Sequence, residues 1–234
     1  FFDTVPFDTY PSEETKYIVR TINEQLPSDL LLFRNEGLIL LFQYITSETI
    51  ESQTSKTYLA LYKPRGVLST MFDPDGRPSL AELVDFRKER LFHVGRLDKD
   101  SEGLILLTND GDLTFRATHP SFGLEKTYII EFDGVLPVGV DTTLLKGVEL
   151  EDGPIQFDQA VVKQTQGNQS ILEVVLHSGR NRIVRRSLAA IGHPVRRLVR
   201  PHIGGLGIDG LRPGQFKRLS SDQIFAMSRD SNWD

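Results

Sequence analysis

The chain has 234 residues, of which 39% are hydrophobic, and a formal net charge of −5. This length and composition are typical of one large folded domain, or of an ordinary domain with an appendage, and not of a disordered chain. The absence of cysteine excludes disulfides and thiolate metal sites, and the five histidines lack ligand-like spacing, so we expect no metal. The longest strongly apolar stretch, 38–45, is too short to cross a bilayer, and we identify no signal peptide. A cytoplasmic protein without a membrane partner is therefore expected.

Charge is unevenly distributed along the chain. Residues 1–55 hold nine acidic and three basic residues, a balance of −6, whereas residues 177–220 hold ten basic residues and one acid, a balance of +9. Nine of those ten bases are arginines, which suit planar stacking and bidentate contacts. Such a block is typical of a surface that binds phosphate groups. The alternative is a solvated helix face whose arginines pair with acids elsewhere in the chain.

The predicted elements begin after a Ser- and Thr-rich stretch at 46–57, which has the composition of a linker. Apolar patterning predicts strands at 57–62, 104–107, 126–132, 157–163, 170–177 and 193–200, and helical segments starting at Ser79 and spanning 113–117, 137–146 and 181–191. Residues 164–169 are polar and are expected to form a loop. These expectations define an α+β domain over 56–234, preceded by an acidic segment of unknown role over 1–55.

The most informative segment is the loop 95–104, with the sequence Gly-Arg-Leu-Asp-Lys-Asp-Ser-Glu-Gly-Leu, which opens onto the apolar strand. Its Asp98 precedes a buried strand, and such rigid scaffolding is where a catalytic group has to be held. The alternative is a turn whose aspartate caps its own backbone. Asp100 and Glu102 are close in sequence, and paired carboxylates also fit a glycoside hydrolase, which would need two catalytic acids and no basic face.

Three distant motifs, taken together and in order, resemble the RsuA-type family of ribosomal RNA pseudouridine synthases. The loop at 95–104 is similar to the family's central Gly-Arg-Leu-Asp motif, and Lys126-Thr127-Tyr128 to its lysine and tyrosine motif. The run from Gly179 to Arg186 resembles the family's Gly-Arg-Asn-Arg-x-Val-Arg-Arg helix start, in the version of the large-subunit branch. The three motifs are the basic loop Lys63-Pro64-Arg65-Gly66, the loop 95–104 and the run 176–186, and the match at 126–128 is additional to them. The resemblance covers residues 56–222.

The resemblance implies a pseudouridine synthase fold, which is α+β with a mixed, mainly antiparallel sheet, flanking helices, a basic face and a central catalytic cleft. It also implies that a specific uridine of ribosomal RNA, in the large subunit, is flipped out and isomerised to pseudouridine. This reaction cleaves the bond from ribose to the base nitrogen, rotates the base and rejoins the sugar to a ring carbon without net redox change, so no cofactor is expected. The expected partner is ribosomal RNA or a pre-ribosomal particle, and the expected protein is a monomer.

Three residues receive catalytic roles from the resemblance. Asp98 is the expected nucleophile, or the stabiliser of a glycosyl cation, and Arg180 would pair with it and keep it ionised in a desolvated pocket. Tyr128 would stack on the uracil and assist the proton transfer at the ring carbon. Eight residues are expected to bind substrate: Lys63, Arg65, Arg96, Leu104, Arg182, Val184, Arg185 and Arg186. Leu104 and Val184 would form apolar walls of the pocket, and the basic residues would contact the RNA.

The sequence also departs from this family. Residues 1–55 are acidic and do not look like the small basic RNA-binding domain that commonly precedes the catalytic domain. Ser178 replaces a usual glutamate, and Ile183 replaces a usual polar residue, which leaves the exact target open. Two alternatives therefore remain: an inactive RNA-binding or ribosome-assembly factor on the same fold, and a synthase that acts on small-subunit ribosomal RNA or on tRNA.

Overall fold

A computed structural model describes residues 55–85, 90–166 and 169–227. The described residues from Lys56 onward belong to one compact unit. The expected linker and the acidic segment lie outside the described residues, apart from the last residues of each. Within the described ranges, no helix is long and apolar enough to span a membrane.

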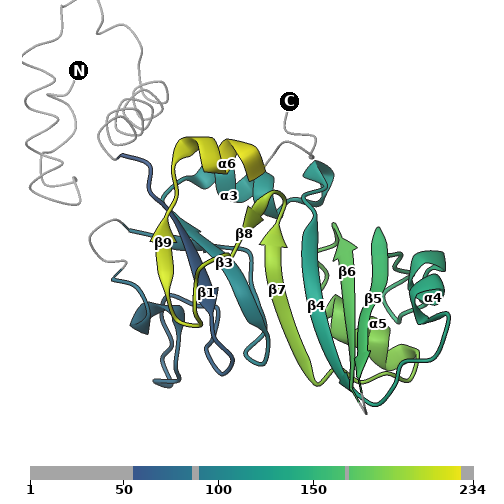
Figure 1. Cartoon of the computed structure of the whole chain (residues 1–234). Helices are drawn as coiled ribbons and strands as arrows, with labels where there is room; N and C mark the ends of the chain where they lie inside the picture. Colours follow the sequence, from purple (N-terminus) through teal and green to yellow (C-terminus); the bar gives the residue numbers. More distant parts are fainter. Residues whose placement is uncertain (1–54, 86–89, 167–168, 228–234) are drawn as a thin grey trace, which may run out of the picture. The chain divides into compact units, whose positions relative to one another are not determined.

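One mixed sheet organises the described part of the chain (Figure 1). Its nine strands are β1 (Tyr58–Lys63), β2 (Phe92–Val94), β3 (Glu102–Thr108), β4 (Lys126–Asp133), β5 (Gln159–Gln166), β6 (Gln169–Leu176), β7 (Arg197–Ile203), β8 (Leu206–Gly207) and β9 (Phe216–Arg218). The main order is β5-β6-β4-β7-β3-β1-β9, with β2 paired to β3 and β8 to β7. Every pair is antiparallel except β3 with β7. The predicted mixed, mainly antiparallel sheet is thus confirmed.

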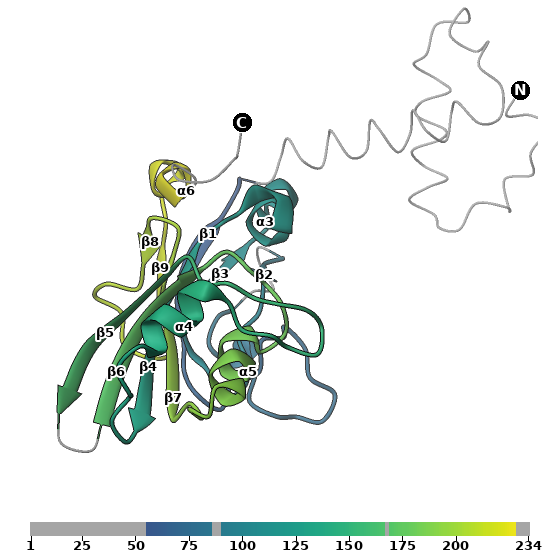
Figure 2. The same cartoon turned by 90° about the vertical axis from the view of Figure 1, so that its right-hand side faces the viewer.

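Helices and short 3-10 turns flank this sheet. They are η4 (Leu80–Glu82), α3 (Gly111–Thr118), η5 (Pro120–Phe122), α4 (Val140–Lys146), α5 (Ile183–Ala190) and α6 (Ser221–Met227). Figure 2 shows α4 and α5 on the same side of the half-sheet formed by β4 to β7. Ile130 and Phe132 of β4 face this side and pack in one core with Leu144 of α4 and Leu188 of α5. The period-two pattern of β4 is therefore that of a sheet covered on one face.

The aliphatic run of β3 is buried on both faces of the sheet. Leu104 and Leu106 pack in a core with residues of α3 and α6, while Ile105 and Leu107 pack in another core that includes Leu80. A strand covered on both faces needs apolar residues at consecutive positions, which explains why the run does not alternate with polar residues.

The two halves of the sheet join where β3 meets β7, with the pairs Glu102↔Val199 and Gly103↔Arg200. Gly103 has φ +115, and a Cβ at this position would lie 2.6 Å from the Arg200 nitrogen, closer than packed atoms can approach. The junction therefore requires glycine at the start of β3, a few residues after Asp98.

Three local predictions are corrected by the structure. The polar stretch 164–169 is not a loop throughout, because β5 and β6 extend into it as far as the pair Gln166↔Gln169. β5 is the edge strand of the sheet, and polar residues are common in strands at an edge. The last long strand is shifted to Arg197–Ile203, and the helix after Ser79 is a single 3-10 turn.

Candidate active site

A cavity of about 700 Å³ lies beside the junction of the two half-sheets. It is lined by the segments 68–70, 72–73, 94–101 and 178–184, together with Arg77, Ala117, Thr118, Lys126, Tyr128, Leu198, Arg200 and Ile203. Loops that follow β1 and β2 thus face the segment that leads into α5. The segments that hold Asp98, Tyr128 and Arg180 all contribute residues to this one cavity, although they are far apart in the sequence, whereas the basic loop 63–66 does not.

The backbone just before Asp98 is held by Ser69. The Ser69 hydroxyl donates a hydrogen bond to the Leu97 carbonyl at 2.7 Å and accepts one from the Leu97 amide at 3.0 Å. Ser69 is 7% exposed, so these bonds form away from solvent. One buried side chain therefore satisfies both peptide groups of the residue that precedes the candidate nucleophile.

The backbone after Asp98 is held by three further contacts. The Gly66 amide donates to the Lys99 carbonyl at 2.7 Å, and the Arg185 guanidinium donates to the Asp100 carbonyl at 2.9 Å. Lys63 completes the set, because its Nζ donates to the Ser101 carbonyl at 2.8 Å. The loop is thus anchored from β1, from the loop after β1 and from α5, and Asp98 has the fixed position that a catalytic group would need.

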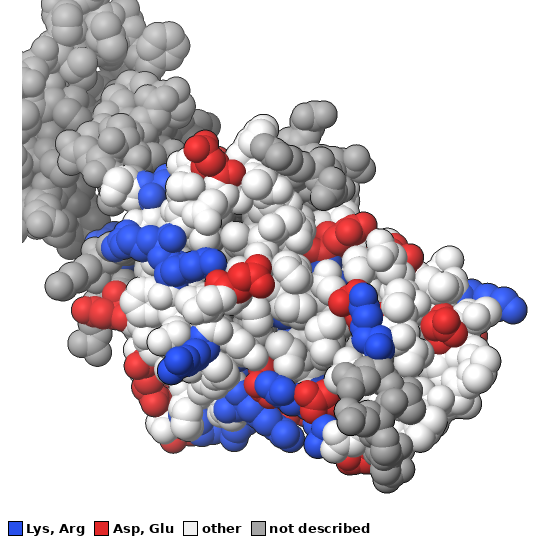
Figure 3. All heavy atoms as spheres, viewed as in Figure 1, with Lys and Arg blue, Asp and Glu red and all other residues white. Residues whose placement is uncertain are grey.

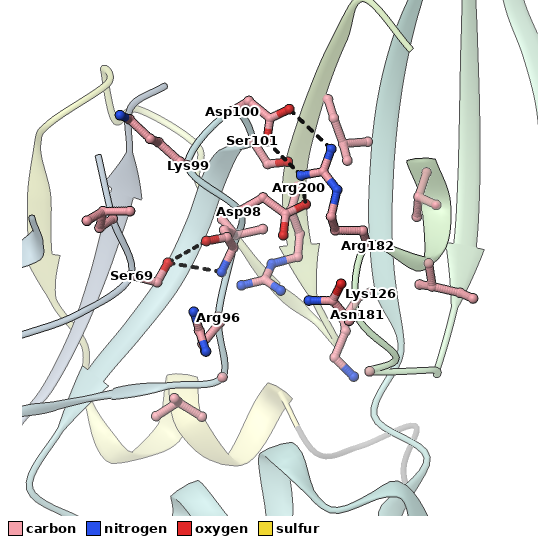
Figure 4. Close-up of a pocket in the computed structure, with 18 of the residues that line it drawn as sticks. Ser69, Arg96, Asp98, Lys99, Asp100, Ser101, Lys126, Asn181, Arg182 and Arg200 are labelled. Atoms are coloured by element: carbon pink, nitrogen blue, oxygen red, sulfur yellow. Dashed lines mark hydrogen bonds and ion pairs between the residues drawn. The ribbon is translucent and has the colours of Figure 1, made fainter. Parts of the chain in front are cut away.

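Asp98 lies within the cavity with its side chain 25% exposed (Figure 4). Its Oδ2 is 3.3 Å from Nη1 of Arg182, which also contacts Asp100 at 3.0 Å. Burial opposes ionisation of Asp100, but the Arg182 hydrogen bond and the Arg185 charge outweigh it and lower the pKa of this carboxyl group. Arg182 has a left-handed backbone with φ 47, a strained conformation for a residue other than glycine.

Arg180 does not make the predicted pair with Asp98. Its Nε and Nη2 bond to the Asp152 carboxylate, and its guanidinium also donates to the carbonyls of Gly153 and Pro154, each at 2.8 Å. These contacts tie Arg180 to the 152–154 loop. Arg182, whose backbone is left-handed, is instead the arginine that forms an ion pair with Asp98. The arginine that pairs with Asp98 is therefore two residues further along the chain than expected.

Cations and the aromatic residue Tyr128 form other parts of the wall. Arg200 is 4% exposed, and its Nε and Nη2 donate to the Leu104 carbonyl at 3.0 and 2.8 Å. Burial, together with the nearby Arg200 charge, lowers the pKa of Lys126 to about 8. Tyr128 is 8% exposed and lines the cavity, as does the exposed Arg96. The cavity thus combines three carboxylates, a larger number of cations and two aromatic rings, which suits an anionic ligand with a planar ring.

Several residues predicted to bind substrate have other positions. Lys63 is fully buried, and its Nζ donates to the Pro64 and Ser101 carbonyls, so it supports the loop and does not reach the RNA backbone. Burial lowers the pKa of Lys63 to about 8. Leu104 is fully buried in the core and does not line the cavity, whereas Val184 does. Arg65 is exposed but does not line the cavity.

The basic block is largely neutralised by acids from other segments. Arg186 and Arg180 share Asp152, Arg196 contacts Glu131 and Asp133, and Arg197 contacts Glu102 and Glu131. The Arg197 hydrogen bond holds the pKa of Glu102 below its usual value. Figure 3 shows blue and red spheres side by side on the face in view. The expected basic face is, for these arginines, a set of ion pairs, as the alternative interpretation proposed.

A metal site is not evident in the described ranges. Within them, no group of three or more His, Asp or Glu residues is close enough to hold an ion.

A sequence model of the family described as RNA pseudouridylate synthase matches residues 57–190. The chain belongs to this family. This synthase is 49% identical over 173 residues to an uncharacterised RNA pseudouridine synthase of Mycobacterium tuberculosis, covering 73% of this chain and 68% of the relative. It is 37% identical over 173 residues to the ribosomal large subunit pseudouridine synthase B of Bacillus subtilis, covering 71% and 69%. A crystal structure of a pseudouridylate synthase matches with a TM-score of 0.65 at 28% identity, over 74% of each chain.

These matches confirm the predicted family, fold and enzyme class of the synthase. Ser69 was missed by the sequence reasoning, and no local signal could have revealed it, because its partner Leu97 is 28 residues away. The pairing of Arg182 with Asp98 was missed for the same reason, since it depends on an unusual backbone angle and on a distant loop.

Proposed function

We propose that this synthase isomerises a specific uridine of large-subunit ribosomal RNA to pseudouridine, with Asp98 as the nucleophile. The observation that carries the proposal is a carboxylate on a loop anchored on both sides, inside a cavity of about 700 Å³. That volume is in the range of sites that enclose small ligands. The choice of RNA is supported by the Bacillus subtilis relative, whose name assigns it to the large ribosomal subunit.

In the proposed reaction, the Asp98 carboxylate attacks C1′ of the ribose while the bond from C1′ to N1 of uracil breaks and N1 keeps the electron pair. The uracil then rotates, and C5 supplies the electron pair of the new bond to C1′, which releases the carboxylate. Loss of the proton from C5 and protonation of N1 complete the isomerisation. Atoms and charge are conserved, and no co-reactant is consumed.

Two neighbouring residues support this chemistry. We assign to Arg182 the role of keeping Asp98 ionised, which the resemblance implied for Arg180, because Arg182 forms an ion pair with the carboxylate at 3.3 Å. Tyr128, on the cavity wall, would stack on the flipped uracil and assist removal of the C5 proton. Stacking contributes about 1–3 kcal/mol, which offsets part of the few kcal/mol needed to flip the nucleotide.

The test uses transcripts of large-subunit, small-subunit and transfer RNA labelled with tritium at C5 of uridine. We expect the protein to release tritium from the large-subunit transcript and Asp98→Asn to release none while still binding it. Asp112→Asn, which removes an exposed carboxylate on α3, serves as the matched control and should remain active. Release of tritium only from the small-subunit or transfer RNA would refute the proposal that large-subunit ribosomal RNA is the substrate. Binding without release by any variant would indicate an inactive RNA-binding factor instead.

A further inference from the structure

Phe72 is an exposed aromatic residue at the cavity that holds Asp98. It lies in the loop between β1 and η4, it is 78% exposed, and it is among the residues that line the cavity. A phenyl ring stabilises the folded state mainly when it is buried, so an exposed Phe72 contributes little to the stability of the fold. An exposed aromatic ring beside a ligand cavity is a candidate contact for the ligand itself.

The loop that carries Phe72 is pre-organised on both sides. The Thr70 hydroxyl donates to the Phe72 carbonyl at 2.7 Å and accepts from its amide at 3.3 Å. On the other side, Arg77 donates to the Asp73 carboxylate from its amide at 2.8 Å and from its guanidinium at 2.6 Å. The backbone of Phe72 is therefore fixed before any ligand arrives, which lowers the entropic cost of a contact.

Phe72 also lies between two hollows. Together with Asp73 and Arg77 it lines a second cavity of about 780 Å³, whose other walls come from 71, 76, 79 and 81–85. The ring is thus part of a partition between this hollow and the one that holds Asp98. When one nucleotide of an RNA strand occupies the Asp98 cavity, this partition is a surface on which its neighbour in the strand can lie.

We propose that Phe72 is a stacking platform for the base next to the target uridine. The proposal rests on the proposed function, because it needs an RNA strand with a nucleotide flipped toward Asp98. RNA-binding proteins commonly stack unpaired bases on aromatic side chains, and every base offers a ring face for this purpose. A base stacked on Phe72 would keep the RNA locally unpaired and hold the target nucleotide over the cavity. Phe72 then contributes to RNA binding and positioning, and Asp98 to the chemistry.

Tritium release from the labelled large-subunit transcript tests this role through the separation of KM from kcat. Phe72→Ala is expected to raise the KM for RNA about 5- to 150-fold with little change in kcat, the range that corresponds to loss of one stacked base. Phe72→Trp, which keeps a stacking face, should bind at least as tightly as the wild type. The matched control is Phe216→Ala, which removes a phenyl ring that is 46% exposed and lines neither cavity. A wild-type KM for Phe72→Ala would overturn the proposal.

A second measurement does not depend on turnover. The sequence contains one tryptophan, Trp233, so the double variant Phe72→Trp with Trp233→Phe has its single tryptophan at the platform, which can be excited selectively over the tyrosines. Stacking of a base should quench its emission when the same transcript is added to saturation. Unchanged emission at saturation would refute the stacking role. If the wild type releases no tritium from any RNA, the proposed function fails, and the quenching result alone then decides the role of Phe72.

Discussion

Removal of the Ser69 hydroxyl should loosen the candidate nucleophile without touching it. In Ser69→Ala, the amide and carbonyl of Leu97 lose their common partner at a site that is 7% exposed, where water cannot easily replace it. An unsatisfied buried polar group costs about 1–3 kcal/mol. Two such groups, with some relaxation of the loop, should lower the free energy of unfolding by about 2–4 kcal/mol.

The same change should reduce kcat, because the Leu97 peptide precedes Asp98 directly. A displacement of about 1 Å in a reacting group can cost on the order of 100-fold in rate, so we expect a loss of about 10- to 100-fold in kcat with a smaller change in KM. Tritium release should be measured well below the melting temperature of each variant. Ser69→Thr keeps the hydroxyl and should recover part of the rate, while Ser221→Ala, at an exposed position, should match the wild type. A destabilised Ser69→Ala with unchanged kcat would refute the positioning role.

Three further changes probe the site and its scaffold. Arg182→Gln should reduce kcat about tenfold or more, as measured by steady-state tritium release. Arg180→Gln should mainly loosen the 152–154 loop. A larger loss of tritium release for Arg180→Gln than for Arg182→Gln would reverse the assignment. Gly103→Ala should lower the free energy of unfolding in urea by about 3 kcal/mol or more, because its Cβ would meet the β7 backbone. Gly111→Ala, with open space around it, should leave this free energy nearly unchanged. Equal stabilities of the two variants would contradict the close junction. Burial lowers the pKa of Lys63 from 10.5 to about 8, so between these pH values the unfolded chain binds more protons than the folded protein. The free energy of unfolding should therefore rise with pH over this range and be lower below pH 8. Lys63→Met should flatten this rise in unfolding experiments at pH 7 and pH 10, and identical pH profiles for the two proteins would contradict the burial argument.

Local sequence patterns predicted most of the fold. The unbroken aliphatic run of β3 and the alternation in β4 depend only on which faces are buried, and both are visible in the sequence. The polar residues at 164–166 misled the prediction because an edge strand tolerates polar side chains, and the edge position of β5 is a property of the whole sheet.

The candidate site was likewise predicted from the sequence only in part. The sequence by itself determined the family and the position of Asp98 between a glycine-bounded loop and a buried strand. Only the tertiary structure decided which arginine pairs with that aspartate. Arg180 bonds to Asp152, 28 residues away in the sequence, and Arg182, whose backbone is left-handed, lies 3.3 Å from Asp98.

Tertiary structure likewise decided that Lys63 is buried and that much of the basic block is ion-paired. The physical reason is that a local pattern encodes backbone conformation and burial. The partners of a charged or polar side chain are set by the segments that folding brings next to it.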